Sequence, residues 1–123
     1  MASKKWFDLT RANEFGFEEA QVRELVVTFE QSLQKEIAII EAALAAGDDM
    51  KTANALHALK GFMPLFSEPG LAQTITDLYQ TSREQPLRET APLFTALVPN
   101  LSSLLLEVRA WLAAPTAYDS GCV

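Results

Sequence analysis

The chain of 123 residues contains one histidine, His57, and one cysteine, Cys122. Imidazoles and thiolates are the side chains that most readily act as nucleophiles or metal ligands near neutral pH. One of each cannot form a Cys₂His₂ zinc site, a disulfide framework or a two-histidine metal site. If this protein carries out chemistry of this kind, the sequence assigns it to His57.

The residues around His57 indicate that its imidazole faces away from the protein core. At about 100° per residue, Leu56, Leu59 and Met63 lie about 100–160° round the helix axis from His57 and form the apolar side. The face that His57 shares holds small or polar residues: Ala53, Asn54, Lys60, Gly61, Pro64 and Glu68. This pattern argues against a histidine satisfied in the core. A solvated histidine without a chemical role remains the alternative.

Two neighbours suggest what an exposed imidazole would do. Gly61 lies one turn beyond His57, in mid-helix, where glycine costs about 1 kcal/mol relative to alanine. It leaves space beside the ring and lets the backbone of a partner come close. Lys60 places a cation beside any anion on the ring, as a phosphoryl group on a histidine nitrogen would need. The alternatives are close helix packing for Gly61 and a solvated lysine for Lys60.

Apolar residues at steps of three and four predict helices along the whole chain. A long helix is expected from Glu18 to Ala46, ended by Gly47, with Asp48 or Asp49 capping the next. That next helix carries His57. Pro64 predicts a kink in it, or an end near Phe62.

Two further helices are expected beyond a turn at 69–70. One begins at Leu71 and fades in the polar link 83–86. The other begins near Thr90 as its N-cap, is bent by Pro99 and is stopped by Pro115. Before all of these, a short amphipathic piece from Trp6 to Phe15 would cover one end.

The pattern as a whole predicts an all-α fold. Four long amphipathic segments with short connections indicate an antiparallel up-down four-helix bundle with a short N-terminal lid helix. We expect one domain over residues 1–114 and a flexible tail over 115–123. No strand alternation competes with the helical pattern.

Composition narrows the class of protein. With 49% hydrophobic and 21% charged residues the chain is typical of a globular domain. Its 16 acidic and 10 scattered basic residues argue against a nucleic-acid partner. The apolar stretch from Leu93 to Leu112 contains Pro99, Glu107 and Arg109, so we expect no membrane span there. Cys122 close to the C-terminus suggests a reducing compartment or no structural role, and the expected location is cytoplasmic.

The string Ala55-Leu56-His57-Ala58-Leu59-Lys60-Gly61 resembles the His-x-Leu-Lys-Gly signature of histidine-containing phosphotransfer (HPt) domains. The surroundings are similar too, with Phe29 on a long upstream helix, Gly47-Asp48 before the histidine helix, and Leu71 after it. The resemblance spans roughly residues 8 to 113.

The resemblance implies a phosphorelay intermediate of two-component signalling. His57 would accept a phosphoryl group from a receiver-domain aspartate and pass it to another receiver. Lys60 would be the cation near the phosphoryl group, and Gly61 the clearance for the receiver. Such a protein is a carrier without kinase activity and has no cofactor of its own, because Mg²⁺ belongs to the receiver. Its partners would be response-regulator receiver domains and a hybrid sensor kinase, and it would be a monomer.

Two departures from the family pattern keep alternatives open. Phe62-Met63-Pro64 follows the glycine where the family usually has Ser or Ala, and Ser67 stands where a glycine is usual. These residues favour a second interpretation, a helical-bundle interaction or regulatory module in which His57 is never phosphorylated. An enzyme that used His57 as a general base would need a second polar group to work with it, and the sequence places none at a suitable spacing. Haem ligation would need an apolar pocket around the histidine, and the outward direction of His57 argues against it.

Overall fold

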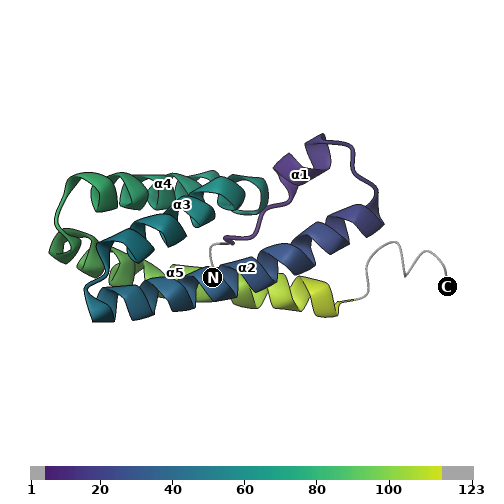
Figure 1. Ribbon diagram of the computed structural model, residues 1–123. Helices are drawn as coiled ribbons and strands as arrows, with labels where there is room; N and C mark the ends of the chain where they lie inside the picture. The colour runs from purple at the N-terminus through teal and green to yellow at the C-terminus, as the bar shows by residue number, and fades with distance from the viewer. Residues whose placement is uncertain (1–4, 115–123) are drawn as a thin grey trace.

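The computed structural model describes residues 5–114, and within this range it is all-helical (Figure 1). The helices are α1 (Thr10–Glu14), α2 (Glu19–Ala46), α3 (Asp49–Phe66), α4 (Pro69–Glu84) and α5 (Leu87–Ala113). No strand occurs in this range, although an isolated bridge joins Phe7 to Ser67. The prediction of an all-α fold is confirmed. The tail expected over 115–123, with Cys122, lies outside the described residues.

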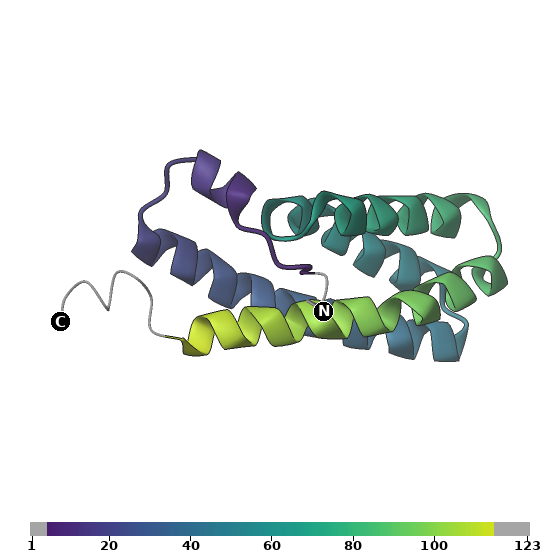
Figure 2. The ribbon, with the colours of Figure 1, turned by 180° about the vertical axis from the view of Figure 1, so that it is seen from behind.

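The four longer helices lie side by side in two layers. Helices α3 and α4 form one layer, and α2 and α5 form the other (Figures 1 and 2). α2 contacts α3 and α5, and α4 contacts the same two helices. Both α2 and α5 continue beyond the α3–α4 layer at one end, and α1 lies over this extension. The result is a closed arrangement in which each long helix buries its apolar stripe.

The junction between α2 and α3 follows from local sequence signals. Gly47 ends α2 in the left-handed conformation, with φ of 69°, which costs glycine little because it has no Cβ. The Asp48 side chain then accepts a hydrogen bond from the Lys51 backbone N–H at 3.0 Å. Both the predicted stop and the predicted cap are confirmed.

Helix α3 continues past the point where the sequence predicts a kink or an end. Pro64 lies inside the helix, which runs to Phe66, so an end near Phe62 is wrong. Pro64 lacks the N–H that would bond the Lys60 carbonyl. Tertiary packing outweighs that loss, because Met63 and Phe66 on either side of the proline are buried in the core. Phe66 stacks on Phe29 with ring centroids 4.6 Å apart.

The bounds of α4 and α5 also differ from the prediction. α4 begins at Pro69 and stays helical to Glu84, through residues expected to form a link. The Glu68 side chain accepts a hydrogen bond from the Leu71 backbone N–H at 2.8 Å. Glu68 therefore caps a helix that begins two residues before the predicted start at Leu71. α5 begins at Leu87, before the predicted N-cap. Thr90 is instead buried inside the helix, which runs uninterrupted through Pro92 and Pro99.

Helix α5 is long and apolar enough, by length and composition, to cross a membrane. Core helices of globular proteins share this property, and Phe94, Leu101 and Leu104 of α5 belong to the buried core. On its outer side, Leu93 and Leu106 are 52% and 65% exposed. The expectations of a cytoplasmic location and of no membrane partner therefore stay predictions.

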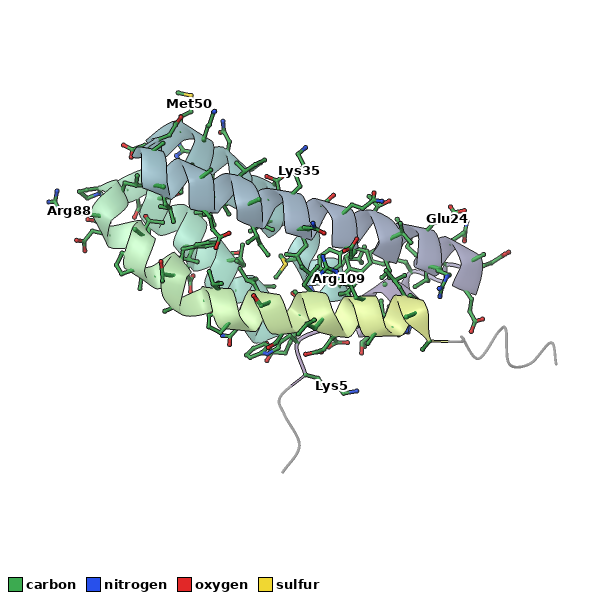
Figure 3. The ribbon with its side chains drawn as sticks, turned by 90° about the horizontal axis from the view of Figure 1, so that it is seen from below. Lys5, Glu24, Lys35, Met50, Arg88 and Arg109 are labelled. Carbon is green, nitrogen blue, oxygen red and sulfur yellow. The ribbon has the colours of Figure 1, made fainter. Side chains whose placement is uncertain are left out.

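Polar contacts join the last turns of α5 to α2. Arg109 of α5 points toward α2 in Figure 3. Its Nε donates to Glu30 Oε2 at 2.9 Å and its Nη2 to Gln34 Oε1 at 2.6 Å. These hydrogen bonds link the two helices of this layer to each other.

The N-terminal segment is extended before α1 rather than helical from Trp6. Glu107 Oε1 accepts from the Trp6 and Phe7 backbone N–H groups at 2.9 and 3.0 Å. The Asp8 N–H donates to the Phe66 carbonyl at 2.9 Å, and the Glu68 N–H donates to the Trp6 carbonyl at 2.8 Å. The backbone groups of this segment therefore bond to α5 and to the α3–α4 junction instead of forming hydrogen bonds within a helix. The segment packs against the core, with Trp6, Phe7 and Leu9 partly buried.

Candidate functional site

His57 lies in the middle of α3 with its side chain exposed. Leu56, Leu59 and Met63 on the other side of the helix are fully buried. The predicted outward orientation of the imidazole is therefore confirmed. The ring is accessible to a partner, whereas haem ligation in an apolar pocket has no support here.

Gly61 is exposed one turn further along α3. A Cβ added at this glycine would meet no atom within 4 Å. Its φ is not positive, so the backbone does not require glycine either. Close helix packing does not explain Gly61, and the space that it leaves opens to the outside.

Lys60 is partly buried and is directed toward α4. Its Nζ lies 5.3 Å from the centroid of the Tyr79 ring. The same ring lies 5.2 Å from the His57 ring, centroid to centroid, with the two planes tilted by 54°. The imidazole and the ammonium group predicted to act together thus share one aromatic neighbour.

Tyr79 and Arg83 are members of this site that sequence reasoning missed. Arg83 Nη1 donates to the Tyr79 hydroxyl at 2.8 Å, and its guanidinium carbon lies 5.8 Å from the ring centroid. Tyr79 follows the apolar residues Leu71, Ile75 and Leu78 along α4, but it lies about 100° round the helix from Leu78. That offset, together with a hydroxyl that needs a partner, is the signal that identifies it.

The site opens into a hollow between α3 and α4 of about 560 Å³, called here the α3–α4 hollow. His57, Tyr79 and Arg83 line it. The other lining residues are Asp49, Met50, Ala53, Asn54, Ser82 and Gln85. Most of these side chains are polar and about half of the lining surface is polar, so the hollow can receive a hydrated or charged group.

A second hollow of about 290 Å³ lies on the other side of α3, against α2, and is called here the α2–α3 hollow. It is mostly apolar and includes Gly61. The other lining residues are Leu25, Thr28, Phe29, Ser32, Phe62, Leu65 and Phe66. Phe62 packs edge-on against Phe29, with centroids 5.5 Å apart, so this departure from the family pattern serves packing.

Pro64 faces the N-terminal segment. It is partly buried and lines a small hollow of about 150 Å³ with residues of that segment, including Asp8, Thr10 and Arg11. Hydrogen bonds from Thr10 hold the pKa of the Asp8 carboxyl below its usual value, and the nearby Arg11 acts in the same direction. The far end of the His57 face is therefore bordered by the N-terminal segment.

Metal-binding groups do not gather in the described part of the chain. Over residues 5–114, no set of three or more His, Cys, Asp or Glu side chains is arranged to hold a metal ion. The expectation of a carrier without its own cofactor stays a prediction.

No protein-family model, curated protein or solved structure matches the chain. The functional proposal therefore rests on the geometry around His57 and on the sequence string that contains it.

Proposed function

We propose that this chain is a phosphorelay intermediate, built as an antiparallel up-down four-helix bundle with an N-terminal lid helix. It accepts a phosphoryl group on His57 from a receiver-domain aspartate and passes it to a second receiver. The observation that carries the proposal is an exposed imidazole in mid-helix, with open space at Gly61. The Lys60 ammonium group lies beside the same Tyr79 ring that the imidazole contacts. A nucleophile that must meet a protein-bound phosphate needs this access.

The reaction is an in-line displacement at phosphorus. The lone pair of one ring nitrogen of neutral His57 forms the N–P bond as the bond between phosphorus and the aspartate oxygen breaks. The carboxylate leaves with the electron pair, and the other ring nitrogen keeps its proton. Transfer onward is the reverse, with the carboxylate of the second receiver as nucleophile. The receiver supplies Mg²⁺, which neutralises developing charge.

The α2–α3 hollow is the surface we assign to the receiver. Its apolar lining includes Gly61, which follows His57 by one turn, and Leu25 on α2. An apolar patch beside the nucleophile suits a transient protein contact, while the polar side of α3 stays free for the phosphoryl group.

The second candidate is an interaction module in which His57 is not phosphorylated. Pro64, which the family pattern lacks, favours it because this residue removes a helical hydrogen bond on the His57 face. The two candidates differ in whether a covalent phosphate appears on the protein.

Transfer from phosphorylated receiver domains of the same organism separates them. The protein should gain phosphate that is labile in acid and stable in base, and His57→Gln should gain none. The exposed position of His57 means that this variant should keep the circular dichroism spectrum of the parent. Receiver binding without transfer to the wild-type protein would favour the interaction module and contradict the relay.

A further inference from the structure

The two hollows beside α3 offer a phosphoryl group on His57 very different surroundings. The α2–α3 hollow is mostly apolar, and His57 does not line it. The α3–α4 hollow is lined mainly by polar residues and has about as much polar as apolar surface, and His57 lines it together with Asn54, Ser82 and Arg83. Transfer of a doubly charged group into apolar surroundings is strongly unfavourable. A phosphoryl group on this ring therefore belongs in the α3–α4 hollow.

Arg83 is the cation that lines this hollow, since Lys60 lies outside its lining. A guanidinium group has five N–H donors, of which the contact with the Tyr79 hydroxyl uses one. Among residues 5–114, Arg83 has no carboxylate partner within salt-bridge distance. Donors in a planar fork therefore remain for phosphate oxygens. Asp49, at the first turn of α3, is the carboxylate that lines the same hollow.

Tyr79 connects the components of the site. Its ring contacts His57 and lies near the Lys60 ammonium, and its hydroxyl bonds to Arg83. One partly buried side chain of α4 thus contacts the nucleophile and lies beside two cations. A long arginine that is anchored at its tip loses less conformational entropy when it binds an anion.

We infer that Arg83 binds the phosphoryl oxygens on His57 within the α3–α4 hollow, and that Tyr79 positions Arg83 and the imidazole for this. The inference rests on the proposed function, because it concerns the same phosphorylated ring. Arg83 forms and breaks no covalent bond. It stabilises charge on the phosphoryl oxygens during transfer.

The test uses phosphoramidate, a small phosphoryl donor that reaches His57 without a docked receiver. Phosphohistidine formation is followed by ³¹P NMR for the wild-type protein and for Arg83→Gln. Loss of one charge-assisted contact should slow phosphorylation about tenfold or more. Arg83→Lys should recover much of the rate because it restores the charge. Arg88→Gln, a change at an arginine outside the hollow at the start of α5 (Figure 3), is the matched control and should keep the wild-type rate.

Tyr79→Phe tests the positioning role separately. It keeps the ring beside His57 and removes the hydroxyl that anchors Arg83, so the rate should fall while thermal unfolding changes little. The ¹⁵N shifts of the phosphorylated ring should also move in this variant, which a purely structural role would not produce.

Failure of the inference and failure of the proposed function give different results. If the wild-type protein is phosphorylated and Arg83→Gln keeps its rate, Arg83 is not part of the site and the relay proposal stands. An unchanged rate in Tyr79→Phe overturns the positioning role. If neither phosphoramidate nor any cognate receiver phosphorylates His57, the proposed function fails and the inference fails with it.

Discussion

The Lys60 ammonium lies 5.3 Å from the centroid of the Tyr79 ring, on the side of α3 that faces α4. A cation over an aromatic ring at a partly exposed site gains about 0.5–1 kcal/mol. That is weaker than a charge-assisted hydrogen bond to phosphate, at about 1.5–3 kcal/mol. The ring therefore keeps Lys60 close to the imidazole without competing strongly with an arriving anion.

Lys60→Ala should slow phosphoryl transfer to His57 while leaving the fold intact. We expect about a tenfold loss in the single-turnover rate with a phosphorylated receiver. The free energy of unfolding should change by no more than about 1 kcal/mol, since a single cation–π contact is lost. Lys51→Ala, at an exposed lysine in the first turn of the same helix, is the matched control. Equal rates for the two variants would remove Lys60 from the mechanism.

Gly61 is expected to be a position where stability and docking oppose each other. Gly61→Ala adds a methyl group into open space and should raise the free energy of unfolding by about 1 kcal/mol. Gly61→Arg should block the receiver, so transfer from an aspartyl phosphate should be lost while phosphorylation by phosphoramidate continues. Urea denaturation and the two transfer assays measure these effects. Normal receiver binding by Gly61→Arg would refute the clearance role.

The parts of the site that local sequence rules predict lie on one helix. The outward direction of His57 follows from about 100° per residue, and the Gly47 stop and Asp48 cap follow from backbone chemistry. The contribution of α4 could not be predicted in this way. Which residues of α4 meet His57 depends on the register between two helices, and a periodic apolar stripe does not specify that register.

The sequence did not predict that α3 continues through Pro64, for a related reason. A proline rule states the local cost, whereas the buried neighbours Met63 and Phe66 supply the compensation, and their partners come from other elements. The N-terminal segment shows the same effect. Its amphipathic pattern suggests helix from Trp6, but Glu107 and the α3–α4 junction bind its backbone in an extended form.

Pro64→Ala should stabilise the protein. Alanine restores the N–H that the Lys60 carbonyl lacks, and proline inside a helix costs about 3 kcal/mol relative to alanine. Loss of the partly buried proline ring offsets part of this, so we expect a gain of up to about 3 kcal/mol. Urea denaturation gives the value. A lower free energy of unfolding would show that the proline ring contributes more by packing than it costs the helix.

Asp8 should make the N-terminal segment sensitive to acid. Because its pKa is lowered in the folded protein, ionised Asp8 contributes stability that is complete above its ordinary value of 3.8. That contribution is lost as the pH falls through the lower, folded-state value. Asp8→Asn should therefore be less stable than the parent at pH 7, and the difference should shrink at the acid end. Urea denaturation at several pH values measures it, and a difference independent of pH would contradict the assignment.

Glu107 should hold the N-terminal segment onto α5. Its carboxylate accepts hydrogen bonds from two backbone N–H groups, those of Trp6 and Phe7, and Glu107→Gln replaces this charged acceptor with a neutral amide. Charge-assisted bonds are worth more than neutral ones, so the free energy of unfolding should fall by about 1–2 kcal/mol. Hydrogen exchange should accelerate at residues 6–8 before it does in the middle of α2. Glu41→Gln, at an exposed glutamate of α2, is the matched control.

The same variant tests whether the segment acts on the histidine site. The segment borders the far end of the His57 face at Pro64, two turns beyond the imidazole, and it does not line the α3–α4 hollow. Loosening it should therefore leave phosphorylation of His57 by phosphoramidate at the wild-type rate, even where exchange at residues 6–8 is fast. A parallel loss of phosphorylation would show that the N-terminal segment supports the nucleophile, and it would place Pro64 on the path between them.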